Sequence, residues 1–139
     1  MARELFVDTG AWVALADADD QHHARAAAFL PTALAEYQRL VTTDLVVAES
    51  YIILRLALGH TPAVAFLQRL RASPRIERVY VTEAIGLEAE EILRRYRDQD
   101  FSLTDAVSFA LMRQRGMDTA FAFDAHFSTA GFVRLPVAA

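Results

Sequence analysis

Four carboxylates of this chain lie inside or directly after apolar runs of sequence. They are Asp8, Glu49, Asp105 and Asp124. An ionised carboxylate that is buried without a cation or strong hydrogen-bond donors costs on the order of several kcal/mol. Because four such groups occur in a chain of only 139 residues, the pattern predicts that they share a bound cation.

The amino-acid composition limits which cation fits these acids. The sequence contains no cysteine, which excludes thiolate zinc sites, iron–sulfur clusters and disulfides and favours a reducing, cytoplasmic location. Oxygen ligands without thiolates or convergent histidines select Mg²⁺ or Mn²⁺ rather than zinc. Such an ion polarises a phosphate and lowers the pKa of a bound water. The acids therefore predict metal-dependent phosphoryl-transfer chemistry that needs no histidine base.

Each acid also has a simpler interpretation that needs no metal. Asp8 and Asp124 follow strand-like runs and have the residue type of a helix N-cap, and Ser102 to Asp105 fits the capping-box pattern. Glu49 resists this interpretation, because a glutamate on the apolar face of a helix caps nothing. Its neighbours three and four positions away are all apolar, namely Leu45, Val46, Ile52 and Ile53. Taken together, the four acids favour a metal site over separate structural roles.

The elements that must position these acids alternate between strands and helices. Apolar, β-like runs predict five strands, at residues 4–7, 39–42, 76–81, 119–123 and 132–135. Strands separated by helices form a parallel sheet, so we expect an α/β fold with a single domain over residues 1–139. Binding sites of such sheets lie at the carboxyl ends of the strands. Asp8 and Asp124 follow strands at that edge, and Glu49 and Asp105 lie in the first turns of helices that begin there.

The predicted helices differ in how much of their surface is apolar. Residues 44–58 and 102–115 are apolar on nearly all sides, which predicts two deeply buried helices. Thr61 and Pro62 are typical of an N-cap and a first helical position, and an apolar stripe follows them. The alanine-rich segment 21–38 also favours a helix, but we expect Pro31 to break or kink it.

The histidines and arginines receive smaller roles. His22 and His23 follow three aspartates, but the spacing does not fit a calcium loop, so we interpret them as part of a solvated loop. His126 lies two residues after Asp124 and could touch a phosphate, but a lone histidine is more often structural. All 14 basic residues are arginine, and half of them lie at predicted helix C-termini, away from the catalytic edge. Arg25 and Arg55 are better placed to contact a phosphate.

The acids and their flanking residues resemble the PIN-domain ribonucleases, specifically the VapC-type toxins of toxin–antitoxin pairs. The resemblance spans essentially the whole chain. It rests on four segments, Val7-Asp8-Thr9, Ala48-Glu49, Ser102-Leu103-Thr104-Asp105-Ala106 and Phe123-Asp124-Ala125-His126-Phe127. No single segment is specific, but the order and spacing of all four are.

This resemblance implies a PIN-like three-layer α/β/α fold with a central, mainly parallel five-stranded sheet. It also implies an endoribonuclease that depends on Mg²⁺ or Mn²⁺ and hydrolyses RNA phosphodiester bonds with a metal-activated water. The matching positions give the catalytic and metal-binding quartet Asp8, Glu49, Asp105 and Asp124. The hydroxyls of Thr9 and Thr104 are expected to support this quartet. Asp100 is either a further supporting acid or an exposed loop aspartate.

The same resemblance implies three partners: an RNA substrate, a second copy of the chain in a homodimer, and a cognate VapB-type antitoxin that covers the active site. The composition agrees with protein partners, because 54% hydrophobic residues and a mean hydropathy of +0.19 predict surplus apolar surface. A net charge of −4 argues against broad electrostatic capture of nucleic acid but allows a local basic groove. No long apolar stretch predicts a membrane span, so no membrane partner is expected.

Other interpretations fit the sequence less well. Receiver domains and haloacid-dehalogenase-like phosphatases also place aspartates at strand ends, but both use a lysine, which this chain lacks. The phosphatases also need a second aspartate where Gly10 stands. A catalytically silent PIN-like binding module normally loses an acid, whereas all four are present here. A metal-dependent nuclease or phosphohydrolase that is not a toxin, including one that cleaves DNA, stays open, because no motif identifies a contact to the 2′-hydroxyl of RNA.

Overall fold

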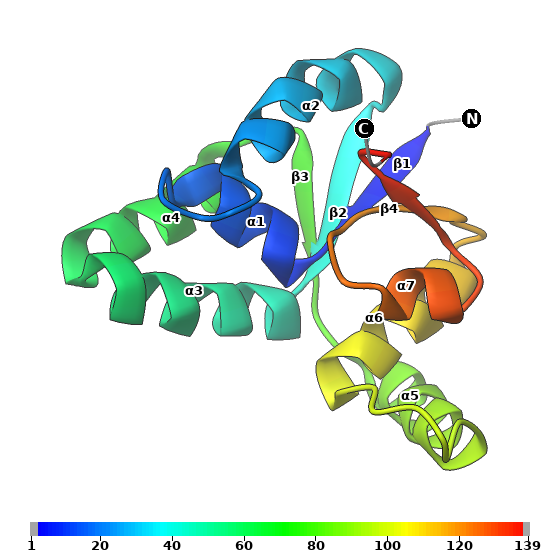
Figure 1. The fold of residues 1–139 in the computed structure, drawn as a ribbon. Helices are drawn as coiled ribbons and strands as arrows, with labels where there is room; N and C mark the ends of the chain where they lie inside the picture. The colour runs from blue at the N-terminus through cyan, green and yellow to red at the C-terminus, as the bar shows by residue number, and fades with distance from the viewer. Residues whose placement is uncertain (1–2, 138–139) are drawn as a thin grey trace.

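The computed structural model describes residues 3–137, which form a five-stranded sheet and seven helices (Figure 1). The strands are β1 (Glu4–Val7), β2 (Arg39–Thr43), β3 (Ile76–Val79), β4 (Thr119–Phe121) and β5 (Val133–Leu135). The helices are α1 (Thr9–Ala16), α2 (His23–Glu36), α3 (Asp44–Leu58), α4 (His60–Ala72), α5 (Glu83–Arg95), α6 (Leu103–Gln114) and α7 (His126–Thr129). All strand pairs are parallel, in the order β3-β2-β1-β4-β5. The predicted α/β class and five-stranded parallel sheet are confirmed.

The strand order places a topological switch point between β1 and β4. The chain moves outward from β1 through β2 to β3, and it then returns to β4 on the far side of β1. Right-handed crossovers therefore put α1 to α4 on one side of the sheet and α5 to α7 on the other, as Figure 1 shows. Ligands of open parallel sheets bind where the strand order reverses. The ends of β1 and β4, which precede Asp8 and Asp124, meet at this point.

Aromatic packing beneath this edge fixes the positions of the site residues. Phe6 in β1, Phe109 in α6 and Phe127 in α7 are fully buried. The Phe127 ring lies 6.1 Å from that of Phe6 and 5.1 Å from that of Phe109, in an edge-on arrangement with the latter. Because α7 has only four residues, this packing rather than helix propensity holds His126 in place.

The predicted strands are confirmed, but their boundaries are shorter at the site. β3 ends at Val79 rather than at residue 81, and β4 ends at Phe121 rather than at residue 123. β5 begins at Val133, one residue later than expected. The apolar residues that follow these strands lie in loops and still cover the core. Ala122, for example, is buried although it lies just after β4.

Of the two helices predicted to be deeply buried, one is buried and the other is not. In α6, every residue from Asp105 to Met112 is buried. In α3, only one stripe of residues is buried, and the second half of the helix exposes Ile52, Ile53 and Leu56, with Leu56 81% exposed. The prediction that α3 is deeply buried was therefore wrong. The same apolar sequence pattern occurs on a helix that faces the core and on a helix that exposes an apolar surface.

Two helices differ locally from the sequence prediction, one in its start and one in the absence of a break. The helix predicted to start at Thr61 begins at His60 with Gly59 as its N-cap. Gly59 has a φ of 96°, a backbone conformation that favours glycine, and it turns the chain from α3 into α4. In α2 the helix continues through Pro31 without a break. Pro31 removes one hydrogen bond to the carbonyl of Ala27, and both residues are exposed, so water can replace that bond. None of the helices within residues 3–137 is long and apolar enough to cross a membrane.

Candidate metal centre

Asp8 occupies the start of α1 but does not cap it. It is the N-cap residue by position, yet its side chain makes no capping hydrogen bond. Its backbone N–H donates to the Phe121 carbonyl at 3.0 Å, which ties the end of β1 to the end of β4. The side chain is buried, with only 5% of the residue exposed. Asp8 is thus the N-cap residue by position, as the sequence suggested, but capping by its side chain does not account for the burial of its carboxylate.

The pKa of Asp8 shows that the predicted acids face one region. The pKa of this carboxyl is raised from 3.8 to about 7, with burial as the largest cause. A hydrogen bond from the Thr9 backbone lowers the pKa, and the negative charges of Asp105, Asp124 and Glu49 contribute to raising it. The other three acids, which come from α3, α6 and the segment after β4, therefore lie near enough to Asp8, directly after β1, for their charges to act on it.

Asp105 is held rigidly at the start of α6 by the predicted capping box. The Ser102 hydroxyl accepts a hydrogen bond from the Asp105 N–H at 3.0 Å, and Asp105 Oδ2 accepts one from the Ser102 N–H at 3.0 Å. The capping interpretation of Asp105 is thus correct, but it does not exclude a metal role. A carboxylate has about four lone-pair positions, so capping through Oδ2 leaves Oδ1 available.

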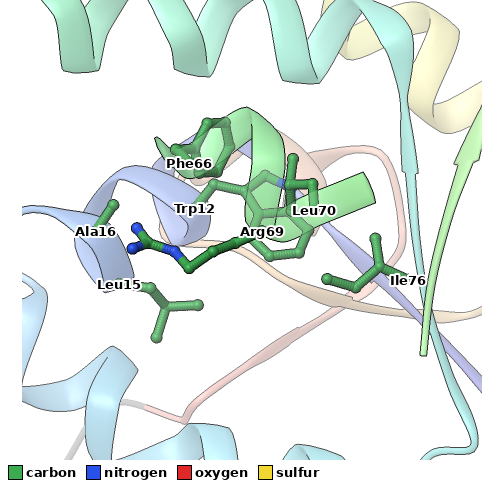
Figure 2. Close-up of a pocket in the computed structure, with 7 residues that line it drawn as sticks. All are labelled: Trp12, Leu15, Ala16, Phe66, Arg69, Leu70 and Ile76. Atoms are coloured by element: carbon green, nitrogen blue, oxygen red, sulfur yellow. The ribbon is translucent and has the colours of Figure 1, made fainter. Parts of the chain in front are cut away.

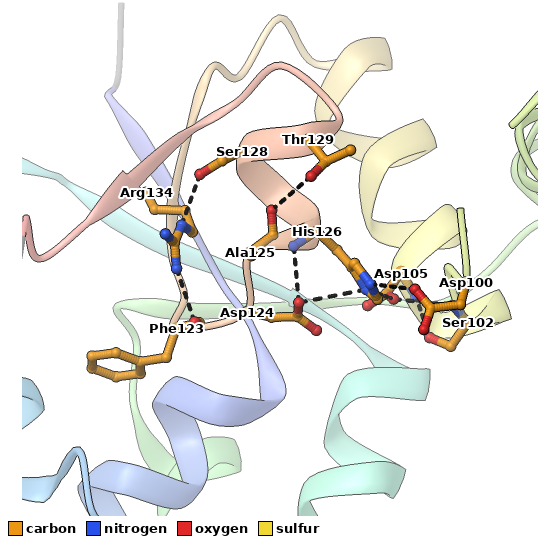
Figure 3. A network of polar contacts seen from close by, with 10 residues as sticks. All are labelled: Asp100, Ser102, Asp105, Phe123, Asp124, Ala125, His126, Ser128, Thr129 and Arg134. Carbon is orange, nitrogen blue, oxygen red and sulfur yellow. Dashed lines mark hydrogen bonds and ion pairs between the residues drawn. The ribbon is translucent and has the colours of Figure 1, made fainter. Parts of the chain in front are cut away.

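Asp124 and His126 form the exposed side of the site (Figure 3). Asp124 Oδ1 accepts a hydrogen bond from the His126 N–H at 2.9 Å, and its side chain is 42% exposed. The His126 ring contacts Asp105 Oδ2 through Nδ1 at 3.0 Å and Asp100 Oδ1 through Nε2 at 2.9 Å. Asp105, Asp124 and His126 can each offer one ligand atom within 4.8 Å of the other two. These three residues form the compact part of the site.

His126 was predicted to be structural, and the structure places it among the acids instead. Burial alone lowers the pKa of its ring, but the hydrogen bonds to Asp105 and Asp100 and the charge of Asp124 outweigh burial and raise it. A protonated His126 therefore offsets part of the negative charge of the site. The only sequence signal for this role is its position two residues after Asp124, because Asp100 and Asp105 come from a distant segment.

The remaining predicted residues lie around this compact group. Glu49 is half-buried in the second turn of α3, and its charge reaches Asp8 although it is outside the group of three. Asp100 is exposed and joins the site through its bond to His126, so the supporting role fits better than that of an isolated loop aspartate. Thr104 is half-buried, and its backbone carbonyl accepts a hydrogen bond from Ser108.

The donor set fits a divalent cation. The Thr9 hydroxyl is buried beside Asp8 and has no hydrogen-bond partner within the described chain, so a water or an oxygen ligand near Asp8 would satisfy it. Carboxylates crowded at a buried edge are stabilised by a cation that replaces their mutual repulsion with attraction. Oxygen-rich donors match Mg²⁺ or Mn²⁺, although the imidazole of His126 could also reach an ion as a neutral ligand.

Arginines lie at the C-terminal ends of helices, as predicted, but Arg55 does not lie near the acids. Arg69 and Arg71 end α4, Arg94 and Arg95 end α5, and Arg113 ends α6. At the opposite edge of the sheet, Arg39 and Arg115 pair with Glu4 and Glu77. Arg55 is also in the last turn of its helix, α3, and so lies at the far end from the acids. It is not placed to contact a phosphate at the site, whereas Arg25 lies beside Phe123, the residue before Asp124.

The protein is an α/β protein with helices on both sides of a parallel sheet and carboxylates beside the switch point of that sheet. The sequence matches the PIN domain over residues 5–133, and the chain belongs to the PIN-domain family. It is 37% identical over 132 residues to the 23S rRNA-specific endonuclease VapC20 of Mycobacterium tuberculosis, in strains CDC 1551 / Oshkosh and ATCC 25618 / H37Rv. That alignment covers 94% of this chain and 97% of the relative.

Solved structures give the same result. The crystal structure of M. tuberculosis VapC20, described as a Sarcin-Ricin loop cleaving toxin, superposes with a TM-score of 0.85 at 36% identity, covering 93% of this chain and 96% of that one. FitAB bound to a DNA fragment has a TM-score of 0.65 at 19% identity, with 94% and 93% coverage. FitAcB from Neisseria gonorrhoeae has a TM-score of 0.63 at 20% identity, with 94% and 95% coverage. The last two share the fold, and the resemblance to VapC-type toxins is confirmed by the first.

Proposed function

We propose that this protein is a metal-dependent endoribonuclease that acts as the toxin of a toxin–antitoxin pair. The observation that carries the proposal is the crowding of Asp8, Glu49, Asp105 and Asp124 at the switch point of a PIN fold. A relative named as an rRNA-specific endonuclease, aligned over nearly the whole chain, supports RNA as the substrate class. A silent binding module would not need a buried carboxylate with a pKa of about 7.

In this proposal, the carboxylates of Asp8, Glu49, Asp105 and Asp124 would hold Mg²⁺ or Mn²⁺. When bound, the ion polarises the scissile phosphate and lowers the pKa of a bound water. The protein's own part is positioning. The capping box fixes the Asp105 carboxylate at the start of α6, and the Asp8 backbone bond to Phe121 fixes the β1 edge. Asp8 must also lose its proton to bind a cation.

His126 is a positioning residue in this mechanism. Its ring bridges the buried Asp105 and the exposed Asp100, and its backbone N–H orients the Asp124 carboxylate. Outer partners of ligating carboxylates fix their direction, and their removal typically reduces metal affinity or activity. The ring also packs against Phe101, with 5.1 Å between the ring centroids, which limits its rotation.

An antitoxin partner has a fitting surface on the α1–α4 side of the sheet. Figure 2 shows a pocket of about 400 Å³ between α1, α4 and β3. Trp12, Phe66, Leu70 and Ile76 give it apolar walls, and Arg69 places a cation at its side. An amphipathic segment with large apolar side chains and an acidic residue complements this pocket. An arginine of the same partner can neutralise the acids of the site.

Homodimer formation is a further part of the proposal. The outer face of α3 exposes Ile52, Ile53 and Leu56 together, whereas exposed leucines elsewhere, such as Leu87 in α5, are more isolated. Two copies of one apolar helix face can bury each other around a two-fold axis, because such an interface is self-complementary. We therefore assign the α3 face, defined by these three residues, to contact with a second copy.

The nuclease proposal is tested by cleavage of a labelled single-stranded or loop-containing RNA with Mg²⁺ or Mn²⁺. We expect cleavage with either ion and none in excess EDTA. Asp105→Asn should abolish cleavage, because it removes a ligand charge while keeping a capping oxygen. Asp118→Asn is the matched control, since Asp118 is an exposed aspartate at the start of β4, the opposite end from Asp124. Undiminished cleavage in EDTA, or by Asp105→Asn, rejects the proposal.

A further inference from the structure

A pocket of mixed lining lies next to the acidic site. It has a volume of about 360 Å³ and is lined by the polar residues His22, Arg25, Ser128 and Arg134 and the apolar residues Ala122, Phe123, Pro136 and Val137. Figure 3 shows Phe123 and Arg134 on one side of Asp124, and Asp105 and Asp100 on the other. Because Phe123 and Asp124 are adjacent in the chain, a ligand bound at the acids can extend directly into this pocket. We call it the arginine pocket.

The two arginines of this pocket carry charge that no acid compensates. Among residues 3–137, neither Arg25 nor Arg134 takes part in an ion pair. By contrast, Arg39, Arg94 and Arg115 are each paired with a glutamate. Arg25 donates to the Pro136 carbonyl at 3.1 Å, and Arg134 donates to the Ser128 hydroxyl at 2.7 Å and to the Phe123 carbonyl at 2.8 Å. Neutral acceptors therefore hold both guanidinium groups in place while their positive charge stays available.

The pocket also contains an aromatic stack. The His22 ring lies parallel to the Phe123 ring, at an interplanar angle of 1° and a centroid distance of 4.3 Å. The Arg25 guanidinium lies 5.3 Å from the centroid of the same phenylalanine. His22 was expected to belong to a solvated loop, but it is half-buried against this ring. Stacked rings beside unpaired guanidinium groups are the two features that bind single-stranded nucleic acid, through bases and phosphates respectively.

We propose that the arginine pocket binds the RNA strand beside the scissile phosphate, with Arg25 and Arg134 on a backbone phosphate and the His22–Phe123 stack against an unpaired base. The inference rests on the proposed nuclease function. Its physical reason is that the protein has a net charge of −4 and an acidic catalytic edge, which repels the phosphates that flank the cleaved bond. An adjacent cationic pocket offsets this repulsion and fixes the direction of the strand.

Binding of a fluorescent single-stranded RNA oligomer, measured by anisotropy over a range of salt concentrations, tests this pocket apart from cleavage. All variants are made in the Asp105→Asn background, so that the RNA stays intact. Arg25→Ala should weaken binding about ten-fold and reduce the slope of log K against log salt by about 0.7, the value for one phosphate contact on a single strand. His22→Ala should weaken binding by a similar factor with an unchanged slope, because stacking is not ionic.

Two controls separate recognition from charge and from folding. Arg113→Ala removes one exposed arginine from the far end of α6 and should change neither affinity nor slope. Arg25→Lys keeps the charge and should retain most of the binding, and the melting temperature of each variant shows that the fold is intact. If Arg25→Ala and Arg113→Ala bind RNA equally, or if the parent protein binds none, the inference is overturned.

Cleavage assays with otherwise wild-type protein distinguish this failure from failure of the nuclease proposal. If the parent cleaves RNA and Arg25→Ala has an unchanged KM, the arginine pocket is wrong and the nuclease stands. If the parent binds RNA through Arg25 but never cleaves it, the pocket stands and the nuclease proposal fails. The expected result is a KM raised about ten-fold for Arg25→Ala, with kcat within two-fold of the parent.

Discussion

At the scale of single residues, Asp8 is a charged group whose burial lowers the stability of the folded protein. The side chain is buried and uncapped, and three other carboxylates raise the same pKa that burial raises. A protein selected for stability alone would place an apolar or neutral residue here. The unfavourable free energy of burying the Asp8 carboxylate is therefore explained only by a bound cation.

We predict that the metal-free protein loses stability as the pH rises from about 4 to about 7. The pKa of Asp8 is raised in the folded state from 3.8 to about 7, so in this window the folded state binds more protons than the unfolded state, and the free energy of unfolding falls with pH. The raised pKa of His126 acts in the same direction. Urea unfolding in EDTA at pH 5.5 and pH 8 should show this fall.

Asp8→Asn isolates the contribution of that residue. It should remove most of the fall and raise stability at pH 8 by more than about 1 kcal/mol, since it deletes a buried charge. Asp118→Asn, at an exposed position, should leave the pH dependence as in the parent. Parallel pH profiles for Asp8→Asn and the parent would contradict the assignment of Asp8.

His126 gives a second prediction at this scale. His126→Ala removes the bonds to Asp105 and Asp100, so both carboxylates lose their orientation. We expect kcat/KM for RNA cleavage to fall roughly 10- to 100-fold, the usual range for a residue that orients metal ligands, and more Mg²⁺ to be needed for half-maximal activity. His60→Ala, on the exposed start of α4, is the control. Activity within two-fold of the parent would show that His126 is structural, as the sequence suggested.

Sequence reasoning singled out the acids as candidate site residues but not His126, for a physical reason. A carboxylate in an apolar run is anomalous by itself, because burial of its charge is unfavourable wherever the chain goes. A histidine is tolerated in cores, loops and sites alike, so its role depends on its partners. Those of His126 are 21 and 26 residues away in the chain, and only the fold brings them together.

At the scale of elements, α6 is both a structural and a functional unit. Its capping box satisfies the first backbone N–H groups and at the same time fixes the Asp105 carboxylate. Its neighbour α5 begins with a similar N-cap, in which the Thr82 hydroxyl accepts from the Ile85 N–H at 3.2 Å, but no acid of the site takes part. The two helix starts therefore allow capping to be separated from catalysis.

We predict that Ser102→Ala and Thr82→Ala each cost about 1 kcal/mol of stability, whereas only Ser102→Ala also lowers cleavage. The reason is that Asp105 loses the hydroxyl bonded to its own N–H and with it part of its fixed geometry. Ser102→Thr keeps the hydroxyl and should preserve both properties. Denaturant unfolding and kcat measured on the same preparations decide the question, and equal activity in the two alanine variants would show that capping does not position Asp105.

Element-level prediction from sequence succeeded where burial forces a pattern and failed where it does not. α6 was recognised because every residue from Asp105 to Met112 is buried, and β1 and β2 because all but their first residue are buried. The burial of α3 was overestimated, because the sequence cannot say whether an apolar residue such as Leu56 meets a core or solvent. We expected Pro31 to break or kink α2, and the break did not occur, because one lost hydrogen bond on an exposed helix side costs less than unwinding the helix.

At the scale of the whole molecule, acidic, basic and exposed apolar residues lie on different surfaces. The acids lie at the carboxyl edge of the sheet, the paired arginines Arg39 and Arg115 lie at the opposite edge, and the exposed aliphatic residues gather on α3. Arg115 raises the stability of that opposite edge through a bidentate contact that lowers the pKa of Glu77. The α3 face and the acidic site are thereby separate, so dimer formation and cleavage can be tested separately.

The last prediction concerns the α3 face and the antitoxin. Light scattering at micromolar concentration should show a homodimer for the parent protein and a monomer for Leu56→Asp, because a charge at this 81% exposed position opposes burial against a second copy. Leu87→Asp, at a leucine 60% exposed on α5, is the matched control and should stay dimeric. The product of the neighbouring gene should bind the parent and suppress RNA cleavage. A strict monomer that forms no complex, and whose cleavage is unaffected by that product, would reject the toxin proposal while leaving the nuclease proposal intact.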